Sequence, residues 1–217
     1  MTRHLALTSV VLALPAFGGE PDFSTSSAKV KRFAEDIVYM VSAGEREPYS
    51  KRWLSAPRLV VNSTDAELAS FVEDSYAEIC REAQLGKAGE TTLTVHIGPS
   101  RTLGKVAAER SRQINLRSGH TYWIWWNEDR SIKDAVVFLC VDQVPAPSAR
   151  HLLLVNVLGA FGFPSKSSEF EETCLSSKRT IRSELTPLDR RLIGFYHRHV
   201  PPGTRKSDLR KLVEASW

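Results

Sequence analysis

The sequence predicts an α+β domain in which a mixed β-sheet is covered on one face, with one buried helix and further helices near the C-terminus. Apolar residues recur every three or four positions in several segments, which is the spacing of helices, and alternate or cluster in short β-branched and aromatic runs, which indicates strands. The resulting order is helix, strand, helix, strand, β-hairpin, buried helix, long loop and helix, an order typical of α+β domains.

The first half of the chain alternates helix and strand. Apolar spacing predicts a helix over residues 28–42, and the run Leu59–Val61 predicts a strand after Pro57. The polar cluster Ser63–Asp65 is typical of a helix N-cap, so a second helix is expected to follow and to end near Gln84. Residues 91–97 predict a second strand, whereas the basic segment 101–118 fits neither pattern clearly.

The second half predicts a hairpin and then helices. Residues 122–126 and 132–141 read as two strands, after which Pro145 and Pro147 are expected to break the chain. Residues 150–161 are apolar almost all round, which indicates a buried helix. A polar loop over 165–183 precedes helices that begin at Thr186–Pro187 and at Ser207.

The N-terminus predicts export. A short positive stretch, the apolar run Leu5–Leu14 and small residues at Ala16 and Gly18 make the three-part pattern of a secretory signal peptide over residues 1–18. The remainder, residues 19–217, is then one domain without an integral membrane segment, in the periplasm or secreted. The alternative is a buried N-terminal helix.

Composition narrows the classes of partner. A net charge of +4, with basic and acidic residues interspersed, argues against a nucleic-acid-binding protein. The three cysteines Cys80, Cys140 and Cys174 allow one disulfide in an oxidising compartment, or three buried thiols. Their spacing does not decide between these two alternatives.

The C-terminal third resembles a known family. The segments Leu158–Pro164, Glu184–Tyr196 and Pro201–Gly203 are similar to a family of secreted bacterial domains of unknown function related to zincin metalloproteases. That family shows a buried helix, the pattern LTxLDRxxLxxLY and a Pro-Gly, and the match covers roughly residues 130–214. The polar residues that the family usually carries around the helix are missing here, where Ser165 and Lys166 stand instead.

The resemblance implies a zincin-like fold that has lost its zinc site. In zincins the buried helix carries HExxH, whose two histidines bind zinc one turn apart while the glutamate takes a proton from the bound water. Aligning the extended motif on Gly162 places the histidines at Val155 and Gly159, the glutamate at Asn156 and a third ligand at Ser165. None of these side chains can serve as intended, so we expect a pseudo-metalloprotease with no catalytic residue at these positions and no cofactor.

Other residues keep a hydrolase as the alternative hypothesis. A rearranged metal or acid-base site would have to draw on five residues, namely His151, Glu169, Glu172, His197 and His199. A surface histidine pair without metal and a solvated acidic loop are the simpler interpretations of the same residues.

The aromatic strand is the remaining candidate for a binding site. Alternation places Trp123 and Trp125 on the face opposite to Tyr122, Ile124 and Trp126, so one set fills the core and the other is either covered or faces a ligand. In zincins an edge strand near the buried helix pairs with extended peptides, and the resemblance implies the same here. The expected partner is therefore a peptide, a protein or a cell-envelope ligand.

Overall fold

The sheet is mixed, as the sequence predicts. The computed structural model describes residues 27–39, 49–178 and 181–217, so the predicted signal peptide lies outside the described residues. The strands are β1 (Arg58–Ser63), β2 (Thr92–Gly98), β3 (His120–Trp126) and β4 (Ile132–Cys140). They lie in the order β1-β2-β4-β3, with β1, β2 and β4 parallel and β3 antiparallel to β4. The α+β class and the β3-β4 hairpin are thereby confirmed.

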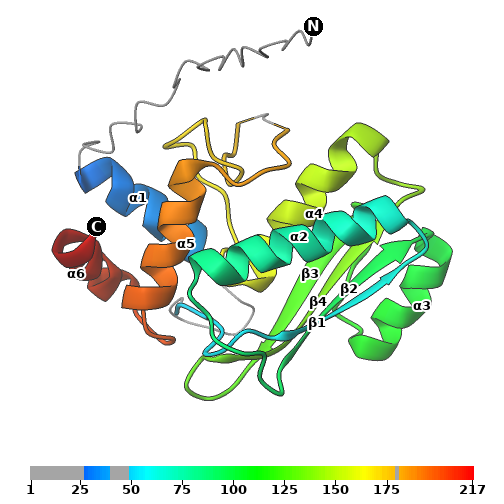
Figure 1. Ribbon diagram of the computed structural model, residues 1–217, viewed down its shortest axis with the longest axis horizontal. Helices are drawn as coiled ribbons and strands as arrows, with labels where there is room; N and C mark the ends of the chain where they lie inside the picture. The colour runs from blue at the N-terminus through cyan, green and yellow to red at the C-terminus, as the bar shows by residue number, and fades with distance from the viewer. Residues whose placement is uncertain (1–26, 40–48, 179–180) are drawn as a thin grey trace, which may run out of the picture.

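Helices cover both faces of this sheet. They are α1 (Ser27–Val38), α2 (Ala66–Glu82), α3 (Ser100–Arg110), α4 (Ala146–Ala160), α5 (Pro187–His199) and α6 (Lys206–Ser216). The long helices α2 and α4 lie on one face, and α1, α5 and α6 group beside them at one end of the molecule, while α3 lies at the opposite end (Figure 1).

The expectation that only one face is covered is wrong. The basic segment 101–118, which the sequence left open, begins with α3, and α3 packs on the second face through Leu103 and Ala107. These two side chains are one turn apart, so they meet Val136 and Phe138 of β4 together. Strand β4 is apolar on both of its faces because it is buried on both.

Helix α4 begins and ends where its backbone requires it. Pro145 is the N-cap and Pro147 lies in the first turn, so the prolines start this helix rather than break the chain. The helix ends before Gly162, whose φ of +102° suits glycine. A side chain at Gly162 would also collide with the carbonyl oxygen of Lys51, which fixes the close approach of these two segments.

The second half of the resemblance consists of structural residues. Thr186 and Asp189 form a capping box at the start of α5, and Asp189 also accepts a bond from the backbone N–H of Cys174. Tyr196 is buried and donates its hydroxyl to the carbonyl oxygen of Lys51 at 2.9 Å. This pattern therefore specifies helix α5 and its packing, and it supplies no reactive group.

The structure also shows the start of α6, the state of the cysteines and the length of the helices. Helix α6 begins at Lys206, one residue before the predicted cap at Ser207. Cys80, Cys140 and Cys174 are all free thiols, and burial raises the pKa of Cys80 to about 11. Within the described ranges, every helix is too short or too polar to cross a bilayer.

Candidate functional site at the edge of strand β3

Strand β3 forms one edge of the sheet. It pairs with β4 on one side, and among the described residues no strand pairs with its other side. All seven residues from His120 to Trp126 are partly buried, so the strand is neither sunk in the core nor fully exposed. An unpaired edge of this length and apolarity is a template on which another chain can add a strand.

The backbone geometry shows which groups face the open side. The N–H of Cys140 donates to the carbonyl oxygen of Gly119 at 2.6 Å, so Gly119 directs this oxygen at β4. Antiparallel pairing alternates along the strand, so every second residue after Gly119 also bonds to β4. The residues whose backbone N–H and C=O groups face the open edge are therefore His120, Tyr122 and Ile124. A weak contact from the Thr121 hydroxyl to the carbonyl oxygen of Tyr122, at 3.4 Å, agrees with this assignment.

The ring of Tyr122 occupies the space beside Gly159. A Cβ atom built on Gly159 would lie 2.5 to 2.8 Å from three atoms of that ring, closer than real carbon atoms approach. The Tyr122 hydroxyl donates to the carbonyl oxygen of Pro164 at 3.1 Å, which holds the ring in place. The position that aligns with the second zinc-binding histidine is thus filled by an aromatic side chain from the neighbouring strand.

Asn156 makes the second link between α4 and β3. Its side-chain amide donates to the carbonyl oxygen of Leu152 at 2.6 Å and lies 3.0 Å from Nδ1 of His120. The amide N–H requires a lone pair on that nitrogen, so the contact favours neutral His120 with its proton on Nε2. Burial lowers the pKa of His120, which also favours the neutral ring. Asn156 is a fixed donor here and has no carboxylate with which to act as a base.

The other two positions that align with the zincin motif, Val155 and Ser165, carry neither histidine nor a carboxylate. Val155 is a partly buried aliphatic side chain on α4. The hydroxyl of Ser165 is 3.4 Å from the carbonyl oxygen of Tyr39, a contact with the backbone after α1. Together with Asn156 and Gly159, these residues offer no imidazole or carboxylate to a zinc ion.

The residues of the alternative hydrolase site are dispersed. These residues are His151, Glu169, Glu172, His197 and His199. They contact different parts of the protein and do not meet in one place. His151 bonds to the carbonyl oxygen of Arg182 at 2.8 Å, and Glu169 pairs with Arg32 at 3.1 Å. Within the described part of the chain, no three His, Cys, Asp or Glu side chains are grouped as a metal site.

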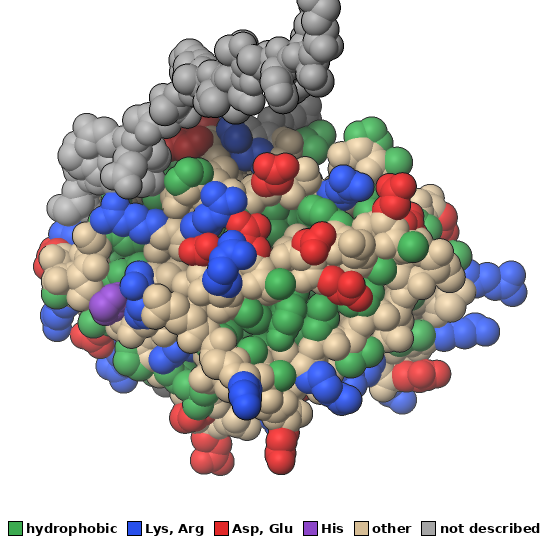
Figure 2. Space-filling view, in the orientation of Figure 1, with side chains coloured by type: hydrophobic (Ala, Val, Ile, Leu, Met, Phe, Trp, Pro, Cys, Tyr) green, Lys and Arg blue, Asp and Glu red, His purple; other side chains and the backbone are tan. Residues whose placement is uncertain are grey.

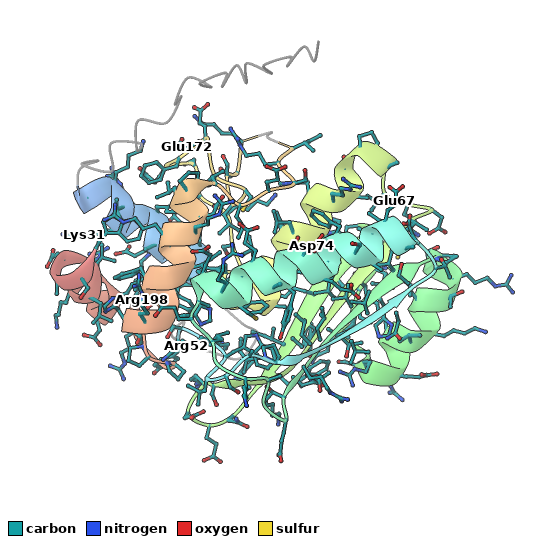
Figure 3. The ribbon with its side chains drawn as sticks, viewed as in Figure 1. Lys31, Arg52, Glu67, Asp74, Glu172 and Arg198 are labelled. Atoms are coloured by element: carbon teal, nitrogen blue, oxygen red, sulfur yellow. The ribbon has the colours of Figure 1, made fainter. Side chains whose placement is uncertain are left out.

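The two C-terminal histidines of that set, His197 and His199, lie in different surroundings. His197 is buried against Phe161 and Phe163, and its desolvation lowers the pKa to about 3. His199 stacks on Phe195 with ring centroids 5.5 Å apart. Glu172 lies on the loop that precedes α5, near the start of that helix and on the side of the molecule away from α3 (Figure 3).

Trp123 and Trp125 occupy the face predicted by alternation. Both are partly buried beside the cluster that α3 forms with β4, together with Ile114 and Leu116. The guanidinium of Arg110 lies 5.1 Å from the Trp125 ring. The indoles are therefore mostly covered by a second layer, and they support the edge strand from behind rather than present an open aromatic surface.

No family model, curated protein or solved structure matches this chain.

The site was partly accessible to sequence reasoning. The aromatic strand and the helix positions Val155, Asn156 and Gly159 were predicted, but their partners on β3 were not. His120 and Tyr122 carry those contacts, and no local pattern marks either as a neighbour of α4. The signal that could have indicated a close approach is Gly159, the single glycine within α4, because a glycine leaves room for a neighbouring segment.

Proposed function

We propose that this protein is exported, has a zincin-like fold without catalytic zinc chemistry, and binds an extended peptide or protein segment along the open edge of β3. The observation that carries the proposal is the outward direction of the backbone groups of His120, Tyr122 and Ile124. An added strand uses such groups for affinity and takes its specificity from side chains on either side.

The zincin-like part rests on the arrangement of β3 and α4 together with the sequence resemblance. An antiparallel edge strand lies directly beside the buried helix that follows the last central strand. Zincins hold peptides on an edge strand in this relation to their motif helix. A chain that keeps this relation and carries Val155 and Gly159 at the ligand positions would retain a peptide-binding edge after losing the metal.

The expected affinity is modest. Three residues with outward N–H and C=O groups offer at most about six backbone hydrogen bonds, each worth about 1 kcal/mol net. Association also costs translational and side-chain freedom. Six such bonds with no association cost would correspond to a dissociation constant of about 40 µM, so we expect weaker values of about 0.1 to 10 mM for an unselected peptide, which is measurable by titration.

Amide exchange tests the edge directly. In the free protein, the amides of His120, Tyr122 and Ile124 should exchange with solvent faster than those of Thr121, Trp123 and Trp125, which face β4. Saturation with a capped octapeptide of alternating valine and glutamine should slow exchange at the three outward amides. The same peptide with every backbone nitrogen methylated cannot donate and is the matched control. Binding that leaves the outward amides unprotected would refute strand addition.

Export is tested separately. Protein recovered from the cell envelope or the medium of an expressing bacterium should have lost its first residues and begin near Gly19. An intact N-terminus on soluble cytoplasmic protein would contradict the export part of the proposal and leave the binding part unaffected.

A further inference from the structure

The positive charge of this protein is concentrated beside β3. Residues 100–118 hold five basic side chains and one acidic one, a net charge of +4 that equals the net charge of all 217 residues. The basic residues are Arg101, Lys105, Arg110, Arg112 and Arg117. Figure 2 shows long Lys and Arg side chains extending into solvent at the end of the molecule where α3 lies.

The segment that joins α3 to β3, residues 111–118, runs alongside the edge strand and is called the basic loop below. Its Ile114 and Leu116 pack with Trp123 and Trp125 on the α3 side of β3. The loop thus returns from the Trp125 end of the strand, near Arg110, to its His120 end.

The charges of the basic loop are exposed and unbalanced locally. Arg112 and Arg117 are exposed, and within the described residues neither forms an ion pair. The sequence from 111 to 127 contains no aspartate or glutamate. A carboxylate arriving at this edge would therefore meet cations without displacing an existing acidic partner.

A further cation lies on the α4 side of the same strand end. The carbonyl oxygen of Pro164 accepts the Tyr122 hydroxyl, and Lys166 follows two residues later with an exposed ammonium group. Its charge acts on both His120 and His151 and lowers the pKa of each, after the larger effect of burial. The first residues of β3 are thus flanked by positive charge on both faces.

The opposite end of β3 carries charges of both signs, since the guanidinium of Arg110 lies 5.1 Å from the Trp125 ring and the ammonium group of Lys51 lies 4.4 Å from the Trp126 ring. The hairpin after Trp126 carries the exposed carboxylates of Glu128 and Asp129. Asp129 also accepts bonds from the backbone and hydroxyl of Ser131, which lower its pKa. The sign of the local charge therefore does not distinguish the two ends of the strand.

Resting on the proposed function, we propose that the segment bound along β3 is acidic, and that Arg112 and Arg117 of the basic loop, together with Lys166, bind its carboxylates. A pocket of about 390 Å³ between α3 and the basic loop is lined in part by Arg112 and Arg117. Arginine suits this task because its planar group binds a carboxylate through two parallel hydrogen bonds.

Three labelled, capped octapeptides test the inference. They alternate valine with glutamate, with glutamine or with lysine, so they share length and strand-forming residues and differ in charge. Anisotropy titrations at low salt should give the glutamate peptide about tenfold tighter binding than the glutamine peptide, since two or three exposed ion pairs supply that factor. The lysine peptide should bind most weakly, and the advantage of glutamate should shrink at high salt.

A charge reversal locates the effect. The double variant Arg112→Glu with Arg117→Glu should abolish the preference for glutamate and leave the affinity for the glutamine peptide within about twofold. The control variant Lys87→Glu with Lys211→Glu makes the same change in net charge at exposed sites on other elements and should keep the preference. Circular dichroism establishes that both variants fold.

The outcomes separate the two proposals. Equal binding of the glutamate and glutamine peptides, with the outward amides of β3 still protected, overturns the acidic ligand and leaves strand addition standing. Failure of all three peptides to bind overturns both. Binding of an eight-nucleotide oligothymidylate that is lost in the Arg112/Arg117 variant, without protection of the β3 amides, would show a general polyanion surface and overturn the inference as well.

Discussion

The two faces of strand β3 are built differently, although the strand alternates regularly. On the α4 side, the ring of Tyr122 packs directly against the backbone at Gly159. The side-chain amide of Asn156 lies 3.0 Å from the imidazole of His120. On the α3 side, Trp123 and Trp125 meet only a short helix and the basic loop. The α4 side of β3 is therefore the more tightly filled of the two.

The tight face should tolerate no enlargement. Gly159→His should lower the free energy of unfolding by about 4 kcal/mol, because the new side chain collides with the Tyr122 ring and buries an imidazole without a partner. Urea denaturation measures the change. The double variant with Tyr122→Gly should recover part of the loss, since it removes the colliding ring. A single variant as stable as the original protein would mean that the two faces are equally loose.

Burial of His197 on α5 should also make the free energy of unfolding depend on acid pH. Burial of His197 lowers its pKa in the folded protein to about 3, below the value of about 6.5 in the unfolded chain. Between these two pH values the unfolded chain binds a proton at His197 and the folded protein does not, which favours unfolding. Its contribution to stability is complete above about pH 6.5 and declines as the pH falls toward 3. Between pH 6.5 and pH 5 we expect the free energy of unfolding to fall by about 2 kcal/mol.

Denaturation curves across this range check the effect of His197. His197→Phe keeps an aromatic ring beside Phe161 and Phe163, and it should flatten the pH dependence by that amount. An unchanged slope in the variant would assign the acid sensitivity to other groups.

The loose face should be less costly to change. Trp123→Ala removes a partly buried ring between β4 and the basic loop, and we expect a loss of about 1.5 kcal/mol, well below the cost for a fully buried tryptophan. The same denaturation experiment compares it with Gly159→His. A loss larger than that of Gly159→His would reverse the ranking of the two faces.

Zinc should have the smallest effect of all. Purified protein should bind no stoichiometric zinc, and added zinc should leave the thermal midpoint unchanged, because Val155, Asn156 and Gly159 offer no imidazole or carboxylate on α4. Elemental analysis and a thermal shift titration measure this. Zinc that is bound one to one and lost in His197→Ala, with chelator-sensitive peptide cleavage, would restore the hydrolase hypothesis and overturn the proposed function.

Sequence patterns predicted the individual elements well where the physics is local. The strands around Leu59, residues 91–97 and the aromatic run are confirmed, and so is the start of α5 at Thr186 and Pro187. Helix α3 was missed because its apolar stripe is short: Leu103 and Ala107 are buried only because β4 presents a second apolar face to them. That face belongs to residues far along the chain, so no window of sequence around α3 contains the reason.

Local patterns in the chain were enough to predict the types and order of most helices and strands. Three features could be found only in the folded protein: Tyr122 fills the space beside Gly159, β3 turns the backbone of His120, Tyr122 and Ile124 outward, and the basic loop runs along that edge. Periodicity and side-chain chemistry are properties of neighbours in the chain, whereas the filling of a volume and the direction of an edge depend on segments that meet only after folding.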